Sequence, residues 1–215
     1  MEEKPNLDVL KGTPYEKDYE IVEFLAKGSF GQVYRLFKPL DGLHYALKVF
    51  EKKVEGNRYE TLFRKEAEIL RAVRSPNVVK YIHFYEHSAC IYILMEYCAG
   101  GDLNRFGKNW IDRNGVVFTE EQVAIITKGI LKGLNHLHSK YSIVHRDIKP
   151  GNILVRNDGT RAITEDDFCI GDFGLSAVFN PLTTLKAKIK CGTDGYHSPE
   201  MLREEAYDTV EVTLT

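Results

Sequence analysis

The segments HRDIKPGN, residues 145–152, and DFG, residues 172–174, decide how this chain is interpreted. The carboxylate of Asp147 can accept the proton of an attacking hydroxyl group, and the ammonium group of Lys149 can neutralise a phosphoryl group in transfer. Asn152 and Asp172 carry oxygen atoms of the kind that bind divalent cations. In this order, the polar groups predict a site for phosphoryl transfer.

A glycine pair lies upstream, in LAKGSFGQVY at residues 25–34. Because Gly28 and Gly31 have no side chains, the backbone there can lie close over phosphate groups and donate N–H groups to them. A glycine in a hairpin is more often a requirement of the turn, so this motif alone is a weak indication.

A lysine and a glutamate add the charges that such a site needs. Lys48, in YALKVF, shares a strand face with Ala46, and a lysine on a buried face requires an anionic partner. Glu66, on the helix that follows, can be that partner. Taken alone, the two residues are better explained as a solvated lysine on an edge strand and a glutamate on a helix surface.

Charge and cysteine content restrict the partners and the compartment. The chain has 29 basic and 31 acidic residues and a net charge of -2, so we expect no nucleic-acid and no membrane partner. The cysteines are widely spaced and lack a Cys-x-x-Cys pair, which predicts reduced thiols in a cytoplasmic protein. They are Cys90, Cys98, Cys169 and Cys191.

The order of the expected elements indicates two parts. Residues 21–28, 31–37, 44–50 and 91–97 are rich in β-branched and aromatic residues, with a hairpin turn signal at Asp41-Gly42. One helical pattern falls among them, from Arg58 to Val73. After Gly100-Gly101, Thr119 and Gln122 form a capping box before a long helix. Its expected apolar stripe is Val123, Ile126, Ile130, Leu134 and Leu137, and a hairpin turn is expected at Asn157, Asp158 and Gly159.

All these motifs occur in one order, from Leu25 to Glu200, and in that order the chain resembles the eukaryotic protein kinase family. The resemblance implies an α+β, bilobal fold, with a five-stranded antiparallel sheet and one helix in the N-lobe and an incomplete, mainly α C-lobe. We therefore expect an extension at residues 1–18, an ATP-binding N-lobe at residues 19–97 and a partial C-lobe at residues 98–215.

The resemblance also implies that ATP and Mg²⁺ are the cofactors and assigns the residues around them. The glycine loop would have Phe30 at its tip, Lys48 would contact the phosphates, and the run MEYCAGGDL would contain the gatekeeper Met95. The residues implied around ATP are Ala26, Gly28, Gly31, Val33, Ala46, Lys48, Glu66, Met95, Glu96, Cys98, Asp102 and Leu154.

For the reaction itself, the resemblance implies that Asp147 orients and deprotonates the substrate hydroxyl and that Asn152 and Asp172 bind Mg²⁺. The motif HRDxKxxN, which contains Lys149, resembles that of the serine/threonine branch of the family, and Thr193 fits the same branch. The implied partner is a protein substrate with a Ser or Thr acceptor. Within the family, the chain looks closest to the NIMA-related or calmodulin-dependent-like groups.

The chain departs from the family pattern at four points. Ala26 stands where the first loop glycine is usual, and Gly151 replaces a frequent glutamate. Ile189 occupies the place of a phosphorylatable threonine, so control would have to use Thr183, Thr184 or another position. The fourth departure is that no D-x-W-S-x-G segment follows the SPE motif. We therefore expect the long helix to expose part of its apolar stripe, which additional C-lobe residues or a protein partner would cover.

Two other functions stay open at this point. A catalytically impaired, kinase-like binding module would use the same surfaces without turnover. Phosphotransfer to a small molecule on the same fold is disfavoured, because residues 172–200 look like a full peptide-docking segment. The presence of Lys48, Glu66, Asp147, Asn152 and Asp172 argues for the enzyme, whereas the incomplete C-lobe argues for the binding module.

Overall fold

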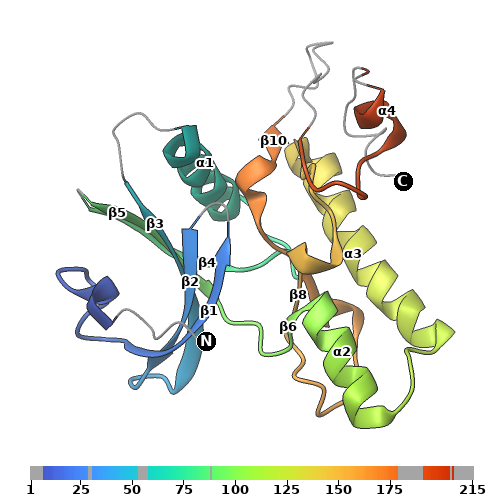
Figure 1. Ribbon diagram of the computed structural model, residues 1–215, viewed down its shortest axis with the longest axis horizontal. Helices are drawn as coiled ribbons and strands as arrows, with labels where there is room; N and C mark the ends of the chain where they lie inside the picture. Colours follow the sequence, from blue (N-terminus) through green and yellow to red (C-terminus); the bar gives the residue numbers. More distant parts are fainter. Residues whose placement is uncertain are drawn as a thin grey trace. The chain divides into compact units, whose positions relative to one another are not determined.

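The computed structural model describes residues 7–28, 31–52, 58–87, 89–178, 191–203 and 205 (Figure 1). The chain divides into two compact units, of which the first comprises Met1–Ala72 and Lys80–Tyr97 and the second comprises Val73–Val79 and Cys98–Thr215. Among the helices in these described ranges, none is long and apolar enough to cross a membrane.

The first unit contains the five-stranded antiparallel sheet that the resemblance to the kinase family implies. Its strand order is β1-β2-β3-β5-β4, and every neighbouring pair is antiparallel. The strands are β1 (Glu20–Gly28), β2 (Gly31–Lys38), β3 (Leu43–Glu51), β4 (Tyr81–Glu86) and β5 (Cys90–Glu96). The predicted turn at Asp41-Gly42 connects β2 to β3, because Gly42 adopts a φ of 70° and the Leu43 N–H donates to Asp41 Oδ1 at 2.9 Å.

Helix α1 (Arg58–Ala72) lies against one face of this sheet, beside β4 and β5 (Figure 1). The helix ends one residue before the predicted end. Its Phe63 is fully buried, and the Phe63 ring centroid lies 5.5 Å from that of Phe50 on β3. Phe63 fixes α1 on the face of β3 that also carries Lys48.

The opposite face of the sheet is covered by the segment before β1, which begins with the 3-10 helix η1 (Leu7–Leu10). Leu10 and Tyr15 are 5% and 3% exposed and belong to one apolar cluster with residues of β2, β3 and β5. Residues 7–18, which the sequence suggests as an extension, therefore contribute to the core of the first unit.

The second unit combines helices with two small sheets. The strand order is β6-β8-β9 in the three-stranded sheet, and β7 pairs with β10 in the other. The strands are β6 (Gly101–Asp102), β7 (Ile143–Val144), β8 (Ile153–Val155), β9 (Phe168–Ile170) and β10 (Ala177–Val178). The α-helices are α2 (Leu103–Asn114), α3 (Glu120–Tyr141) and α4 (Pro199–Leu202), and the 3-10 helices are η2 (Pro150–Asn152), η3 (Glu165–Asp167) and η4 (Phe173–Leu175).

The hairpin expected at residues 157–159 is wider than a tight turn. Strands β8 and β9 pair antiparallel, with Val155 opposite Phe168, so residues 156–167 connect them. Asn157 Oδ1 accepts the Gly159 N–H at 2.8 Å and forms the local turn. The connection is long because it also contains η3, which packs against α3.

Helix α3 begins with the predicted capping box, in which the Gln122 N–H donates to Thr119 Oγ1 and the Thr119 N–H donates to Gln122 Oε1. Val123, the first residue of the predicted apolar stripe, is 48% exposed, in line with the expectation that part of the stripe is uncovered. The buried face contains Ile126, Leu134 and Leu137 of the stripe and also Gly129 and Gly133. A Cβ at these glycines would lie 2.4 Å from Glu165 O and 2.6 Å from Asn77 O, so their absence of side chains lets α3 approach its neighbours.

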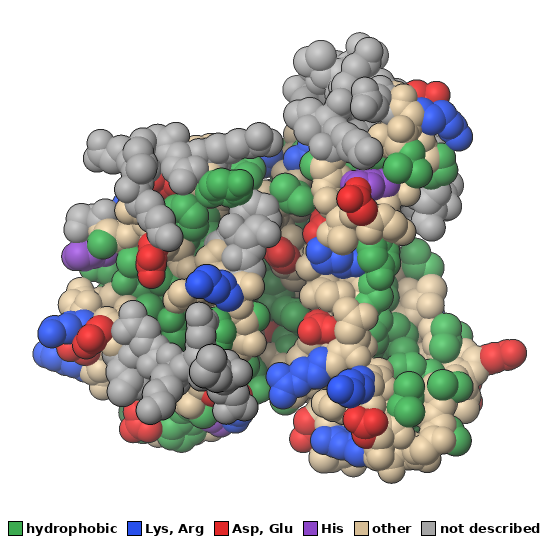
Figure 2. Space-filling view, in the orientation of Figure 1, with side chains coloured by type: hydrophobic (Ala, Val, Ile, Leu, Met, Phe, Trp, Pro, Cys, Tyr) green, Lys and Arg blue, Asp and Glu red, His purple; other side chains and the backbone are tan. Residues whose placement is uncertain are grey.

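The exposed side of α3 is partly apolar. Val123 and Leu131 are 48% and 49% exposed, and Figure 2 shows hydrophobic side chains at the surface of the unit that contains α3. A groove of about 520 Å³ lies there, and none of the predicted site residues lines it. The groove is lined by Phe118, Glu120, Val123, Ala124, Thr127, Lys128 and Leu131.

Candidate active site

The predicted glycine loop joins β1 and β2, where Gly28 lies opposite Gly31. Gly31 has a φ of 129°, and a Cβ at this position would lie 2.3 Å from Val49 O. A side chain at residue 31 is therefore excluded both by its backbone conformation and by the neighbouring strand. Ala26 pairs with Val33 in the same hairpin, and its φ is not positive, so its methyl group causes no backbone strain.

Lys48 and Glu66 form a buried ion pair in the first unit. Lys48 Nζ lies 2.7 Å from both Glu66 Oε1 and Glu66 Oε2, and the two residues are 7% and 1% exposed. Strand β3 presents Lys48 toward α1, and the Lys48 ammonium also lies 5.6 Å from the Phe63 ring centroid. Removal of either partner would leave the other charge buried without this ion pair, and breaking a buried pair costs about 3–5 kcal/mol.

The other predicted nucleotide residues of the first unit are placed by strand register. Val33 lies opposite Lys48, and Ala46 lies opposite Met95, so all four side chains share one face of the sheet. Met95 is buried. Glu96, at the end of β5, donates its N–H to Lys80 O and accepts the Lys80 N–H on Oε1 at 2.6 Å.

In the second unit, Cys98, Asp102 and Leu154 come from the β6-β8-β9 sheet and the segment that leads into it. The Cys98 carbonyl accepts the Gly101 N–H at 3.0 Å, and Asp102 pairs with Leu154 between β6 and β8. Asp102 is also the N-cap of α2, because its Oδ1 accepts two backbone N–H groups of the first turn. Its carboxylate therefore has a structural role in addition to the predicted one.

Three side chains converge on the carboxylate of Asp147. Thr193 Oγ1 donates to Asp147 Oδ1 at 2.7 Å, and Asn152 Nδ2 donates to Asp147 Oδ2 at 2.8 Å. Lys149 Nζ lies 3.0 Å from Asp147 Oδ2 and donates to Thr193 Oγ1 at 2.5 Å. The structure thus brings together the predicted site residues Asp147, Lys149 and Asn152. It adds Thr193, which the sequence marks only as typical of the serine/threonine branch.

These donors determine the protonation state of Asp147. Burial raises the pKa of the Asp147 carboxyl, but the hydrogen bonds from Thr193, Lys149 and Asn152 outweigh burial and lower the pKa below its usual value. Asp147 is therefore ionised at neutral pH. A carboxylate has about four lone-pair positions, and Oδ1 has accepted only the Thr193 hydroxyl. Oδ1 can accept a further hydrogen bond from an incoming hydroxyl group.

His145 supports the same loop as a neutral imidazole. Burial lowers the pKa of His145. Its Nδ1 accepts the Asp147 N–H at 3.3 Å, so Nε2 carries the proton that is donated to Gly171 O at 2.8 Å. The imidazole also contacts the Phe173 ring edge-on, with centroids 5.1 Å apart.

The predicted Mg²⁺ ligands are held by neighbouring backbone. The Gly171 N–H donates to Asn152 O at 2.9 Å, and Asp172 follows Gly171 directly in the chain. Because Asn152 Nδ2 donates to Asp147, the atom that Asn152 can offer to a cation is its carbonyl oxygen Oδ1. With the carboxylate of Asp172, this makes a donor set of hard oxygen atoms, which fits Mg²⁺.

The backbone around the loop is strained in two places. Arg146 and Asp172 have φ values of 67° and 56°, which are unusual for residues with side chains. The Arg146 guanidinium donates to Leu175 O at 2.6 Å and to Ser176 O at 3.4 Å. Such strain persists only where the surroundings enforce it, and it clusters at functional sites.

Gly192 allows Thr193 to reach Asp147. It has a φ of 111°, and a Cβ there would lie 2.6 Å from Arg146 O. Thr193 and Gly192 are functional positions that the sequence did not predict as site residues. The sequence feature that could have identified Gly192 and Thr193 is the segment CGTDGYHSPE, in which a glycine directly precedes a residue with a hydroxyl group.

Some predicted positions lie outside the described residues. They are Phe30 at the tip of the glycine loop, the possible control positions Thr183, Thr184 and Ile189, and the side chain of Glu200.

Comparison with known proteins gives one family for nearly the whole chain. The protein kinase domain family matches residues 19–213. The chain is 35% identical over 211 residues to serine/threonine-protein kinase dst1 of Dictyostelium discoideum, which is 97% of this chain and 26% of that protein. It is 34% identical over 196 residues to myosin light chain kinase A of Dictyostelium discoideum, which is 91% of this chain and 62% of that protein.

A mouse protein gives a similar result. Serine/threonine-protein kinase Nek1 of Mus musculus is 33% identical over 190 residues, which is 88% of this chain and 15% of that protein. The chain thus spans between about one seventh and less than two thirds of the length of these relatives.

Proposed function

The chain belongs to the protein kinase family, and from this membership we propose that it acts as an ATP-dependent protein serine/threonine kinase. The reaction is transfer of the γ-phosphate of ATP to the hydroxyl group of a Ser or Thr residue in a protein. The observation that supports the proposal is the bridge that Lys149 makes between Asp147 and Thr193, because a cation then lies beside an ionised carboxylate, as phosphoryl transfer to a hydroxyl group requires.

Asp147 orients the acceptor in this proposal. The substrate hydroxyl donates to Asp147 Oδ1, and its proton passes to the carboxylate as the hydroxyl oxygen attacks the γ-phosphorus. The bond between the γ-phosphorus and the β,γ-bridging oxygen breaks, and ADP leaves. Thr193 and Asn152 keep the carboxylate in place, and Lys149 neutralises charge on the transferring group. His145 holds the backbone of this loop through the N–H of Asp147.

The first unit contributes phosphate and base contacts. Gly28 and Gly31 bring backbone N–H groups to the phosphates, and Lys48, held by Glu66, contacts the α- and β-phosphates. The sheet face that carries Val33 and Ala46 offers apolar contact to the adenine. The Glu96 N–H already donates to Lys80, so the group that Glu96 offers to adenine is its carbonyl.

The second unit contributes the remaining contacts. The Cys98 carbonyl accepts the Gly101 N–H, so Cys98 offers its N–H to adenine. Leu154 provides a second apolar contact, and the remaining oxygen of Asp102, Oδ2, is available to a ribose hydroxyl or a substrate side chain. Asn152 and Asp172 would hold Mg²⁺, which neutralises phosphate charge when it is bound.

The proposal includes partners and location. The partner is a protein with a Ser or Thr acceptor, and a second protein or further C-lobe residues cover the apolar groove on α3. We propose a cytoplasmic location, because the four cysteines are free thiols. An impaired binding module would be distinguished by the loss of a catalytic residue. Lys48, Asp147 and Asp172 are all present, so this alternative gains no specific support.

Binding and turnover of ATP distinguish the enzyme from the binding module. We expect Mg²⁺-dependent ATP binding and phosphate transfer in the wild-type protein, and retained ATP binding with loss of transfer in Asp147→Asn. If the protein binds ATP but shows no turnover, and Asp147→Asn changes nothing, the binding module is the correct function.

A further inference from the structure

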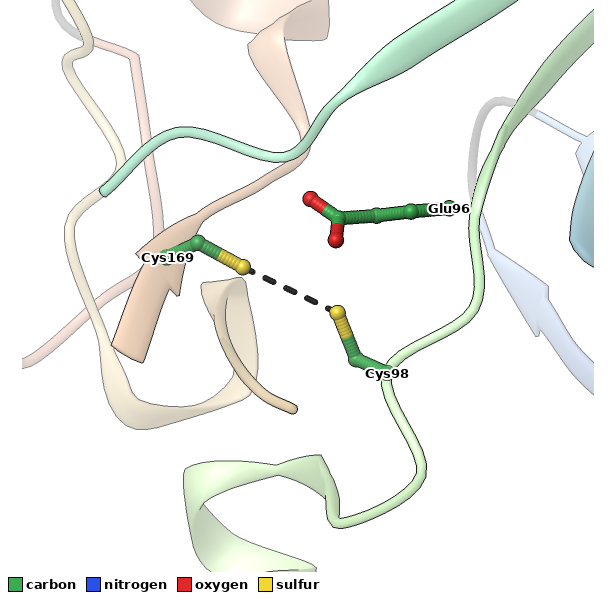
Figure 3. Close-up of side chains that lie close together, drawn as sticks. All are labelled: Glu96, Cys98 and Cys169. Atoms are coloured by element: carbon green, nitrogen blue, oxygen red, sulfur yellow. Dashed lines mark hydrogen bonds between the residues drawn. The ribbon is translucent and has the colours of Figure 1, made fainter. Parts of the chain in front are cut away.

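A pair of buried thiols lies in the second unit, outside the catalytic loop. Cys98 Sγ and Cys169 Sγ are 3.7 Å apart, although the two residues are separated by 71 positions in the chain. The two residues are 6% and 1% exposed. Figure 3 shows the two sulfur atoms pointing toward one another, one from β9 and one from the segment that leads into β6.

The backbone on both sides of the pair is fixed by hydrogen bonds. The Cys98 carbonyl accepts the Gly101 N–H at 3.0 Å, and Cys169 lies opposite Leu154 in the β8–β9 pairing. The Cys169 thiol donates to Leu154 O at 3.5 Å. Cys169 thus contacts both the Cys98 sulfur and a backbone carbonyl.

We propose that Cys98 and Cys169 are a modification site, where a hydroperoxide converts the two thiols into a reversible disulfide. A disulfide has an S–S length of about 2.0 Å, so the two sulfur atoms have to approach by about 1.7 Å. The hydrogen-bonded backbone on both sides keeps each sulfur next to the other.

The reaction balances with the hydroperoxide as the oxidant. The sulfur of one cysteine, as thiolate, attacks a peroxide oxygen, the O–O bond breaks, and a sulfenic acid and one water or alcohol form after proton transfer. The second sulfur attacks the sulfenic sulfur, the S–O bond breaks, and hydroxide leaves and takes the proton of the second thiol as water. Two thiols are oxidised and one hydroperoxide is reduced.

Because the two thiols are buried next to one another, the first oxidation step is slower than the second. Buried thiols react slowly, because the oxidant has to enter through local opening. Once a sulfenic acid forms, the second sulfur is already in contact with it. The first step is therefore slow, the second is fast, and the sulfenic acid does not accumulate.

Two buried cysteines can also pack simply as small apolar side chains with a weak S–H···S contact. The two explanations differ in what an oxidant produces. A pair that only packs yields independent oxidation at each sulfur or none, whereas the proposed site yields a crosslink.

The position of the pair connects it with nucleotide binding, and this part rests on the proposed function. Cys98 and Leu154 are predicted adenine contacts, and Cys169 precedes Asp172 by three residues in the chain. A bond from Cys98 to Cys169 removes the hydrogen bond from the Cys169 thiol to Leu154 O. We therefore expect the disulfide to weaken ATP binding.

Peptide mapping tests the site directly. The protein is incubated with hydrogen peroxide, alkylated, and digested with chymotrypsin, which cuts after Tyr92 and so separates Cys90 from Cys98. We expect a linked peptide pair containing Cys98 and Cys169, lighter than the two reduced peptides by two hydrogen atoms and lost on treatment with dithiothreitol. The link should be absent from Cys98→Ser and Cys169→Ser and present in the control variants Cys90→Ser and Cys191→Ser.

A trapping experiment checks the fast second step. In Cys169→Ser, whose hydroxyl can still donate to Leu154 O, the sulfenic acid at Cys98 has no thiol to react with, so dimedone should label Cys98. In the wild type, dimedone should label neither residue. Sulfinic or sulfonic acid at Cys98 or Cys169 without a link, links formed only with Cys90 or Cys191, or unmodified Cys98 and Cys169 when Cys191 is oxidised would each overturn the proposal.

ATP affinity separates this proposal from the proposed function. The linked protein should bind ATP with Mg²⁺ more weakly than the reduced protein, and reduction should restore binding. Unchanged affinity in the linked protein overturns the connection with nucleotide binding. If the reduced protein binds no ATP but forms the link, the proposed function fails while the modification site is retained.

Discussion

Asp147 shows how neighbouring side chains set the chemistry of a single residue. Its carboxylate is buried, which alone would favour the neutral form, but Thr193, Lys149 and Asn152 stabilise the anion and lower its pKa. Lys149 contributes twice, because it contacts both Asp147 and Thr193. The ionised carboxylate is the form that can accept the proton of a substrate hydroxyl.

Replacement of Lys149 should shift the pH dependence of the reaction. Activity requires ionised Asp147, so kcat/KM falls as the pH drops through the lowered pKa of this group. Lys149→Met removes a hydrogen bond and a positive charge, so the pKa of Asp147 rises and the acid limb of the profile moves to higher pH. Lys149→Arg, which keeps the charge, should move it less.

The measurement is kcat/KM as a function of pH for the three proteins. A lower kcat in Lys149→Met with an unmoved acid limb would show that Lys149 does not act through Asp147.

Gly151 is the residue where a different side chain should change substrate preference. A Cβ there would make only ordinary contacts, at 3.6 Å from Asn104 Nδ2 and 3.8 Å from Lys149 Cε, so the position has room for a side chain. Gly151→Glu should raise kcat/KM for peptides with a basic residue near the acceptor by up to about fivefold, the value of an exposed ion pair. Gly151→Gln, of similar size without the charge, is the control, and an equal gain in both variants would contradict the electrostatic explanation.

The spacing of residues predicts part of this site. Asp147, Lys149 and Asn152 lie in one short segment, so their proximity follows from the sequence. The contact between Thr193 and Asp147 joins positions 46 residues apart, and it depends on the positive φ of Gly192. A hydrophobic pattern along the sequence predicts neither this contact nor the backbone angle of Gly192.

At the scale of elements, helix α3 depends on close approach as well as on its apolar stripe. The sequence predicts its capping box correctly because capping is a local interaction. It does not predict the buried glycines, because a glycine in a helix usually only lowers helix propensity. At Gly129 the backbone of η3 occupies the space of a side chain.

Gly129→Ala should therefore destabilise the protein, although alanine is the better helix former. The added methyl group would lie 2.4 Å from Glu165 O, and overpacking of this kind costs about 1–3 kcal/mol. Gly107→Ala in α2 is the matched control, since its Cβ would lie 3.7 Å from the Phe118 ring and the higher helix propensity should stabilise by up to about 1 kcal/mol.

The free energy of unfolding in urea measures both effects. If Gly129→Ala is as stable as the wild type, α3 does not need the close approach that the structure shows.

At the scale of the whole molecule, each of the two units has its own core, and the segment before β1 belongs to the first. Tyr15 is 3% exposed, its ring contacts Tyr19, Tyr85 and Tyr92 edge-on, and its hydroxyl lies 2.8 Å from His83 Nδ1. Burial raises the pKa of Tyr15 well above its usual value, so it stays neutral. The fold class and four of the five strands of the first unit agree with the expectations, whereas β4 is not among the expected segments. A segment without alternation gives no sign that it packs on a sheet.

Tyr15→Ala should destabilise the first unit by about 3–5 kcal/mol, as for other large aromatic residues in a core. Tyr15→Phe keeps the ring and loses only the hydrogen bond, so it should cost about 0.5–1.5 kcal/mol. Hydrogen exchange of the amides in β2 and β3 reports the change within this unit. Equal protection in all three proteins would mean that residues 7–18 are dispensable for the core.

The central claim is transfer of the ATP γ-phosphate to serine or threonine, with Asp147 as the residue that orients the acceptor. Its most direct test is phosphoamino-acid analysis of a mixed protein substrate after incubation with ATP carrying a radiolabelled γ-phosphate, for the wild type and for Asp147→Asn. The structure predicts label on phosphoserine or phosphothreonine with the wild type and its loss with Asp147→Asn. Label on phosphotyrosine alone, or equal labelling by both proteins, would contradict the claim.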